Sequence, residues 1–325
     1  METKEVVKVE NLKKYFPLGH SGFWRKKKEY LKAVDGISFT IDKGEVLALV
    51  GESGCGKSTT GRILVGLETP TEGRIFIEGK EIKDTKAFKD KSLRQHVQMI
   101  FQDPYASLNP RMTIGEHLME PLLIHYQGHI TKGQAEVRAL KMLKKVGLTP
   151  EEVFFSRYPH QLSGGQRQRV VIARAMILQP KFVVADEAVS MIDLSLRASI
   201  LELLLWFKKE FQLSMLFIAH DFSVAKVIAN TLGVMYLGNM VEIGPMEDLI
   251  KKPKHPYTAA LLSAIPSFEE KRFNLKVKGD IPNPKYPPPG CKFHPRCPLA
   301  REKCSKVVPE LLGKGHKVAC HYPLH

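Results

Sequence analysis

The amino-acid sequence predicts an α/β fold built on a largely parallel central sheet. Three short and almost wholly apolar runs, at residues 46–50, 182–185 and 213–219, have the composition of strands buried on both faces. Segments with helical spacing lie before or between these runs, at residues 114–147, 166–178 and 198–211. Strands that alternate with helices in this way are typical of a parallel sheet covered by helices.

The other segments add strands and one insertion. Further strands are predicted at residues 6–9, 33–41 and 232–241, with a hairpin at residues 75–80. Residues 18–31 contain Trp24 and the basic cluster 25–28, and they are predicted to form an exposed loop insertion between early strands.

The sequence changes character after about residue 265. Five prolines fall between residues 282 and 289, and four of the five cysteines lie beyond residue 290. A stretch so rich in proline does not continue a helix. We therefore expect a main domain at residues 1–265 and a Pro/Cys-rich C-terminal extension at residues 266–325.

Composition and charge restrict the class of protein. The 325 residues carry a formal net charge of +15. This charge fits a nucleic acid or phospholipid partner, and equally a solvated surface. No run reaches the ~18 apolar residues of a membrane span, and the charged N-terminus lacks the apolar segment of a signal peptide. A cytoplasmic location is therefore expected.

Residues 51–58 fit the phosphate-loop pattern G-x-x-x-x-G-K-[ST] and directly follow the apolar run at residues 46–50. Its glycines let successive N–H groups face one phosphate, and the next helix adds a partial positive charge. Lys57 is expected to reach the β- and γ-phosphates, Ser58 to hold Mg²⁺, and Cys55 to be a small filler. The predicted ATP-binding residues of this loop are Gly51, Glu52, Ser53, Gly54, Cys55, Gly56, Lys57, Ser58 and Thr59.

An acidic pair follows the apolar run at residues 182–185. Asp186 is placed to bind Mg²⁺ through water, and Glu187 is placed to polarise the attacking water as general base. Such a pair is common after a strand, but in the same α/β chain as a phosphate loop it indicates nucleotide hydrolysis.

The string at residues 162–166 resembles the LSGGQ signature of ATP-binding-cassette (ABC) ATPases. Other motifs of that family follow the same order: Gln102 matches the Q-loop glutamine, Asp193 the D-loop aspartate and His220 the switch histidine. The resemblance covers residues 5 to about 265. The signature residues it implies are Leu162, Ser163, Gly164, Gly165 and Gln166.

The resemblance implies the P-loop ABC fold, with a mainly parallel core sheet, an antiparallel β subdomain and a helical subdomain at about residues 104–178. It implies ATP and Mg²⁺ as ligands, with Ser58, Gln102 and Asp186 directed at the metal. His220 joins Glu187 as a catalytic residue. An aromatic side chain that stacks on adenine is expected at Tyr15 or Phe16, and the sequence leaves open which of them it is.

In this family the signature acts in trans. Two cassettes pair head to tail, so that each ATP lies between one phosphate loop and the partner's signature. This chain departs from the family at Ala188, where proline usually follows the catalytic glutamate. Hydrolysis is still expected because Glu187 is present, with a position that could be less rigid.

Two stretches resemble the cassettes of dipeptide and oligopeptide importers: residues 102–110, and His255-Pro256-Tyr257-Thr258. This resemblance implies a motor subunit at the cytoplasmic face of the cell membrane, paired as a heterodimer beneath two permeases and served by an extracytoplasmic solute-binding protein. Relatives that carry nickel or oligosaccharides keep the substrate open. A soluble ABC ATPase acting on ribosomes or DNA, and a cassette that binds ATP without turnover, are the alternatives; nucleic acid is not expected as a partner.

The extension carries cysteines in the spacing C-x5-C-x6-C-x15-C, at Cys291, Cys297, Cys304 and Cys320. Four thiolates suit a 4Fe–4S cluster or a tetrahedral zinc ion, and unligated thiols are the third possibility. The resemblance to dipeptide-importer cassettes favours 4Fe–4S. Three histidines lie nearby and are expected to be surface residues rather than ligands: His294, His316 and His321.

Overall fold

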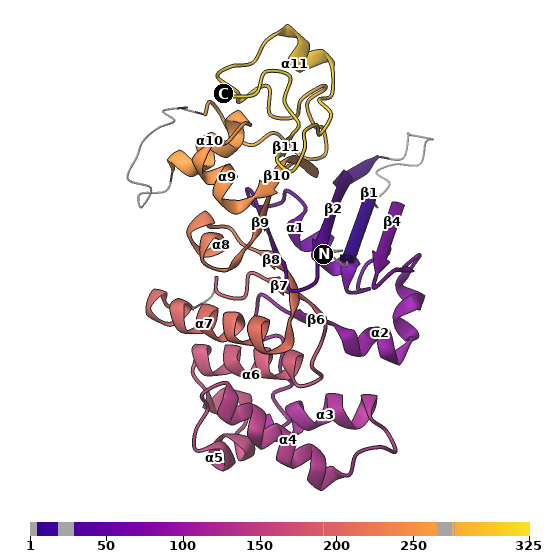
Figure 1. Cartoon of the computed structure of the whole chain (residues 1–325), viewed down its shortest axis with the longest axis vertical. Helices are drawn as coiled ribbons and strands as arrows, with labels where there is room; N and C mark the ends of the chain where they lie inside the picture. Colours follow the sequence, from indigo (N-terminus) through magenta and orange to yellow (C-terminus); the bar gives the residue numbers. More distant parts are fainter. Residues whose placement is uncertain (1–4, 19–28, 191, 265–274, 276) are drawn as a thin grey trace.

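The computed structural model describes residues 5–18, 29–190, 192–264, 275 and 277–325. Trp24 and the basic cluster at residues 25–28 lie outside this part of the chain. Within it, none of the helices combines the length and the apolar character that a membrane crossing requires. Figure 1 shows three layers along the long axis: the helical part at one end, the sheets in the middle and the C-terminal extension at the other end.

A seven-stranded sheet forms the centre of the molecule, and it confirms the α/β class. Five adjacent strands are parallel, and the two at one edge run antiparallel to their neighbours. In spatial order the strands are β11 (Lys317–Val318), β10 (Asn239–Pro245), β9 (Thr231–Tyr236), β3 (Val46–Val50), β8 (Ser214–Ile218), β7 (Phe182–Asp186) and β6 (Val97–Ile100). The accompanying helices are α1 (Lys57–Leu64), α7 (Leu194–Phe211), α8 (Phe222–Ile228), α9 (Met246–Lys251) and α10 (Pro256–Ser263).

A second, antiparallel sheet lies beside the first (Figure 1). Its order is β2 (Tyr30–Asp42), β1 (Glu5–Pro17), β4 (Glu72–Ile77) and β5 (Lys80–Glu81), followed along the chain by the short helices η1 (Thr85–Lys89) and α2 (Lys91–His96). Its buried side chains share one hydrophobic core with Leu47 and Leu49 of β3. This sheet is therefore fixed against the strand that leads into the phosphate loop.

The helical part consists of α3 (Ile114–His125), α4 (Lys132–Lys145), α5 (Glu151–Ser156), η2 (Pro159–Gln161) and α6 (Gly164–Met176). Hydroxyl caps fix where three of these helices begin: Thr113 before α3, Thr131 before α4 and Ser163 before α6. Each forms a reciprocal capping box with a Glu or Gln three residues on. The third of these boxes lies inside the predicted signature.

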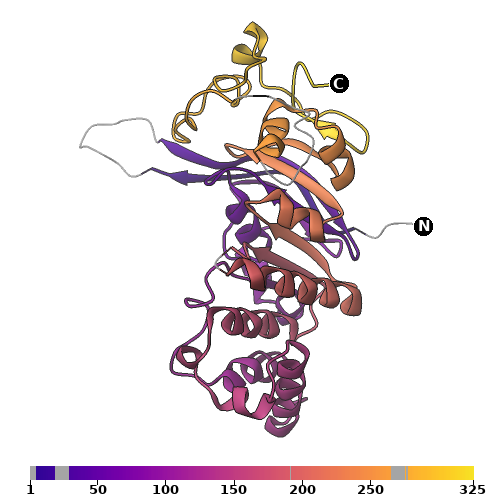
Figure 2. The same cartoon turned by 90° about the vertical axis from the view of Figure 1, so that its left-hand side faces the viewer.

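The C-terminal extension is joined to the main sheet. Apart from α11 (Glu302–Lys306) and β11, its described residues form turns and loops, and β11 adds to the sheet by pairing with β10. The fully buried carboxylate of Glu242 on β10 accepts hydrogen bonds from the backbone of Lys254 and His255 and from Nε2 of His316. Figure 2 shows the extension packed over α9 and α10.

Two predictions of local structure were wrong, and two strands were missed. Residues 232–241 form a hairpin, β9 and β10, because Leu237 and Gly238 both take positive φ (42° and 83°) and reverse the chain. His316 is not a surface residue, since its ring is buried against Glu242. The strands β6 and β11 were not predicted.

Candidate nucleotide-binding site

The phosphate loop connects β3 to α1, and only glycine fits at two of its positions. Gly51 and Gly56 have φ of 147° and 104°. A Cβ atom at Gly51 would lie 2.2 Å from the carbonyl oxygen of Met235, and one at Gly56 would lie 2.2 Å from that of Ala33. The loop is thus packed directly against the backbone of β9 and β2, and its residues Ser53 and Gly54 are exposed.

Lys57 lies inside the curve of the loop. Its ammonium donates hydrogen bonds to the carbonyl oxygens of Gly51 at 2.7 Å and Glu52 at 3.3 Å, and the side chain is only 4% exposed. Cys55 is buried 3.7 Å from the same ammonium, and burial raises the pKa of its thiol. A neutral cysteine therefore fills the loop, and the charge that faces an incoming phosphate is that of Lys57.

Two oxygen-bearing side chains meet at the end of the loop. The hydroxyl of Ser58 donates a hydrogen bond of 2.9 Å to Asp186, the last residue of β7. Burial raises the pKa of Asp186, and the charge of Glu187 adds to this, although the hydrogen bond from Ser58 opposes it. A carboxylate and a hydroxyl at one point beside a phosphate loop are suitable ligands for Mg²⁺.

The carboxylate of Glu187 is contacted by two other predicted site residues. Gln102 donates a hydrogen bond to it at 2.5 Å, and Nε2 of His220 contacts its other oxygen. Glu187 is 7% exposed and lies at φ 49°, and its N–H donates to the carbonyl oxygen of Ile218 at 3.0 Å. This hydrogen bond to β8 fixes the backbone of Glu187, although Ala188 follows it where the family usually has proline. The arrangement suits a base that accepts a proton from water.

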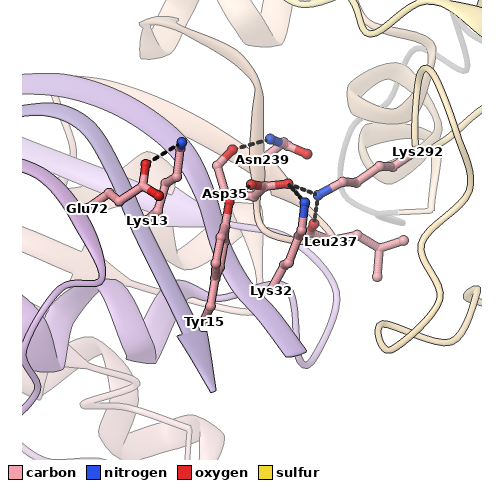
Figure 3. Close-up of polar contacts among 8 residues, drawn as sticks. All are labelled: Lys13, Tyr15, Lys32, Asp35, Glu72, Leu237, Asn239 and Lys292. Atoms are coloured by element: carbon pink, nitrogen blue, oxygen red, sulfur yellow. Dashed lines mark hydrogen bonds and ion pairs between the residues drawn. The ribbon is translucent and has the colours of Figure 1, made fainter. Parts of the chain in front are cut away.

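Tyr15 and Phe16 differ in their links to the loop. The hydroxyl of Tyr15 donates a hydrogen bond of 2.5 Å to Asp35 (Figure 3). The N–H of Asp35 donates to the carbonyl of Gly238, whose own N–H donates to the carbonyl of Cys55. Phe16 instead lies against Lys14, whose ammonium is 4.8 Å from the ring centre. Of these two aromatic residues, Tyr15 is thus the one joined through Asp35 and Gly238 to the phosphate loop.

The signature lies at the start of α6. Ser163 is exposed and caps the helix, accepting a hydrogen bond of 3.3 Å from the N–H of Gln166. A Cβ atom at Gly165 would lie 2.8 Å from the side chain of Leu196. Asp193 is also exposed, at the start of α7. These residues therefore present a second helix N-terminus on the surface of the molecule.

Four cysteines of the extension line one small enclosed cavity: Cys291, Cys297, Cys304 and Cys320. Burial raises the pKa of Cys291 and of Cys320 to about 11 and also raises that of Cys297. Among the described residues, no group of three or more His, Cys, Asp or Glu side chains is arranged so that it could hold a metal ion.

One polar atom in this cavity has no partner. His255, also in the cavity lining, is 1% exposed, and burial lowers its pKa to about 4. Its Nδ1 accepts a hydrogen bond from the N–H of Tyr257, which places the proton on Nε2, and Nε2 makes no hydrogen bond within the described part of the chain. A buried N–H without an acceptor fits a cavity that receives an anionic group such as a thiolate-ligated cluster.

Sequence reasoning missed four residues that support the site. Arg296 pairs with Glu52 of the phosphate loop, and the hydroxyl of Tyr257 accepts a hydrogen bond of 3.0 Å from the N–H of Glu52. Lys292 and Asp35 form an ion pair beside Tyr15. Tyr257 lies in a stretch singled out for its resemblance to importer cassettes, but the pattern assigned it no role.

A phosphate loop, a hydroxyl–carboxylate pair beside it and a glutamate held by glutamine and histidine define a nucleotide hydrolase of the P-loop class. Residues 34–190 match the family described as ABC transporter, and residues 241–304 match that described as the oligopeptide/dipeptide transporter C-terminal region.

Curated proteins of known name resemble the chain over nearly its whole length. The oligopeptide transport ATP-binding protein AppF of Bacillus subtilis is 45% identical over 97% of each chain. The dipeptide transport ATP-binding protein DppF of Escherichia coli is 45% identical over 95% of this chain and 92% of its own. Among solved structures, the dimeric ABC MJ0796 bound to ADP and Pi matches with a TM-score of 0.64 and 30% identity, over 74% of this chain and 98% of its own.

The chain belongs to the ATP-binding proteins of ABC transporters, within the oligopeptide/dipeptide group. It is an ABC ATPase, which binds ATP with Mg²⁺ and hydrolyses the nucleotide.

Proposed function

We propose that the chain is the ATP-hydrolysing motor of an importer for dipeptides or oligopeptides. The observation that carries this proposal is that one chain joins the ATP motifs of an ABC ATPase to the Cys-bearing extension matched by the oligopeptide/dipeptide family. The names of the relatives, which transport oligopeptides or dipeptides, support the same substrate class. The division into a main domain at residues 1–265 and an extension at residues 266–325 belongs to this proposal.

In the proposed mechanism Lys57 and the loop N–H groups hold the phosphates, and Tyr15 stacks on the adenine. Ser58 and Gln102 would hold Mg²⁺, and Asp186 would bind the ion through water. Glu187 accepts the proton of the attacking water. His220 orients this water and contacts the γ-phosphate. The contact between Glu187 and Gln102 supports this assignment, because it ties the base to a residue directed at the metal.

The site is completed by a partner. The exposed Ser163 and the helix N-terminus behind it are placed to bind the γ-phosphate of an opposing cassette, and the opposing signature serves the loop of this chain. We propose a heterodimer with a second ATP-binding subunit, peripheral at the cytoplasmic face of the membrane under two permeases. An extracytoplasmic solute-binding protein delivers the peptide. The charge of +15 suits an anionic membrane surface.

The extension is proposed to hold a 4Fe–4S cluster through Cys291, Cys297, Cys304 and Cys320. In such a cluster each thiolate ligates a different iron, so the four sulfur atoms need not converge on one point, as they must around a zinc ion. The shared cavity and the unpartnered N–H of His255 support the cluster over the ion.

Reconstitution tests the function. The complete transporter is placed in vesicles with the cassettes facing the lumen and ATP enclosed, and uptake of a labelled dipeptide and a labelled oligopeptide is followed after each is added outside with the solute-binding protein. ATP-dependent uptake that Lys57→Ala abolishes is expected. Transport of nickel or an oligosaccharide in place of both peptides would contradict the substrate class, and failure to hydrolyse ATP would contradict the motor itself.

A further inference from the structure

Two basic side chains of the segment at residues 291–297 reach the ATP site. We infer that this segment positions both ends of that site: Arg296 positions the phosphate loop through Glu52, and Lys292 positions Tyr15 through Asp35. The Lys292 half rests on the proposed contact of Tyr15 with adenine, and the Arg296 half rests only on the phosphate loop.

Arg296 forms a two-point ion pair with Glu52. Its Nη1 lies 2.7 Å from Oε2, and its Nη2 lies 3.0 Å from Oε1. The side chains are only 10% and 24% exposed. Nη1 also donates to the hydroxyl of Tyr236 at 3.3 Å, at the end of β9. A planar guanidinium that donates to both oxygens of a carboxylate fixes the orientation of that carboxylate and also neutralises its charge.

Glu52 is an informative partner because it lies inside the phosphate loop. Its carbonyl oxygen accepts a hydrogen bond from Lys57, so a change in its position moves an acceptor of the ammonium that reaches the phosphates. Its carboxylate is also an anion next to the binding site of a polyanion. Without Arg296 this charge would repel ATP, and with Arg296 it is neutralised.

Lys292 acts at the other end of the site (Figure 3). Its ammonium donates to Asp35 at 3.0 Å and to the carbonyl of Leu237 at 2.8 Å. The other oxygen of Asp35 accepts the hydrogen bond of Tyr15. Lys292 thus orients the carboxylate that holds the aromatic ring, and it fixes the turn between β9 and β10 against which the loop packs.

The segment is itself firmly held. Phe293 is 1% exposed and packs against both Tyr236 and Tyr257, with ring centres 5.3 and 5.1 Å away. The N–H of Cys291 donates to the carbonyl of Cys304 at 2.8 Å, and that of Cys297 donates to the carbonyl of Phe293 at 3.0 Å. A rigid support of this kind organises the loop before ATP arrives, so that binding does not have to order it.

The test measures equilibrium binding by calorimetry with the full-length chain carrying Glu187→Gln, so that the ligand is not consumed. Arg296→Ala is expected to weaken Mg-ATP binding about five- to tenfold. This is the effect of losing a hydrogen-bonded charged pair, reduced because solvent partly screens the two side chains. Arg301→Ala is the matched control, because Arg301 lies in the same extension and stacks on Tyr322 instead. It is expected to bind ATP like the parent.

A double-mutant cycle separates positioning from general stability. When Glu52 is replaced by Gln, the further change Arg296→Ala should cost little affinity for Mg-ATP. The carboxylate that Arg296 positions and neutralises is already absent in that background. Arg296→Lys, which keeps the charge without the two-point contact, should lie between parent and Ala, and it serves if Arg296→Ala does not fold. An equal loss from Arg296→Ala in the parent and in the Glu52→Gln background would overturn the inference, as would unchanged affinity in Arg296→Ala.

The two ends are told apart with inorganic triphosphate as the probe. Arg296→Ala should weaken binding of both Mg-ATP and triphosphate, whereas Lys292→Met should weaken only Mg-ATP. A loss of triphosphate binding in Lys292→Met, equal to its loss of ATP binding, would refute the assignment of Lys292 to the adenine end. Failure of the parent chain to bind ATP at all would refute the proposed function instead.

Discussion

The hydroxyl of Ser58 donates a hydrogen bond of 2.9 Å to Asp186, which joins the start of α1 to the end of β7. These residues lie far apart in the sequence, and the parallel pairing of the core strands brings them to one edge of the sheet. The phosphate loop and the acidic pair therefore lie next to each other at the carboxyl ends of the parallel strands.

Asp186→Asn keeps the size of the side chain and its hydrogen bond but removes the negative charge that Mg²⁺ requires. We expect the ATPase rate of the assembled transporter to fall on the order of 100-fold, the size of a metal contact worth several kcal/mol. The rate is measured by phosphate release over a Mg²⁺ titration. Asp248→Asn, at an exposed position in α9, is the control, and an Asp186→Asn enzyme with the parent's rate would show that the metal lies elsewhere.

Tyr15→Ala and Phe16→Ala separate the two aromatic candidates. Stacking on a base contributes roughly 1–3 kcal/mol, so loss of the stacking ring should weaken ATP binding about 5- to 100-fold. We expect this loss for Tyr15→Ala and almost none for Phe16→Ala, measured by calorimetry. The reverse order would mean that the link through Asp35 to the loop does not identify the stacking residue.

The ion pair of Asp35 gives the stability of the chain a defined pH dependence. Burial alone would raise the pKa of Asp35, but the hydrogen bond from Tyr15 and the charge of Lys292 hold it below the ordinary value of 3.8. A carboxyl with a lowered folded-state pKa stabilises the fold above its unfolded pKa, and this stabilisation is lost as the pH falls through the folded pKa.

Melting temperatures of the parent and Asp35→Asn, measured from about pH 6 down to about pH 3, test this sign. The parent should be more stable at the upper end, and the difference should shrink at the acid end. The exposed Asp280→Asn should show no such trend. A difference that grows on acidification would contradict the contacts assigned to Asp35.

The extension makes a prediction about metal content. Anaerobic purification should give a coloured chain with about four irons per molecule. Cys291→Ser should lose the iron and the colour, whereas Cys55→Ser should keep both because Cys55 lies in the phosphate loop. One zinc per chain, or a colourless chain free of iron, would exclude the cluster.

The sequence was sufficient for the fold class and for the order of the ATP motifs, because buried parallel strands and a Gly-rich loop have strong local patterns. The hairpin of β9 and β10 was missed although its turn carries a local signal, because Gly238 and Asn239 interrupt the apolar residues on either side. The burial of His316 was not predicted because its partner, the buried Glu242, lies 74 residues earlier in the chain.

The contacts of Lys292 and Arg296 could not be predicted for the same reason. Each is a single basic residue in a segment whose visible pattern is the spacing of its cysteines. Their partners, Asp35 and Glu52, are separated from them by more than 240 residues. Only the folded chain shows that the Cys-bearing segment lies against the ATP site.

The central claim is that this chain hydrolyses ATP with Glu187 as the base. The test is Glu187→Gln in the assembled transporter, for which both the rate of phosphate release and the affinity for Mg-ATP are measured. Glu210→Gln, on the exposed face of α7, is the control. The account predicts that Glu187→Gln binds Mg-ATP like the parent and that the turnover of its site falls on the order of 100-fold or more. Turnover at the parent's rate from that site would contradict the account.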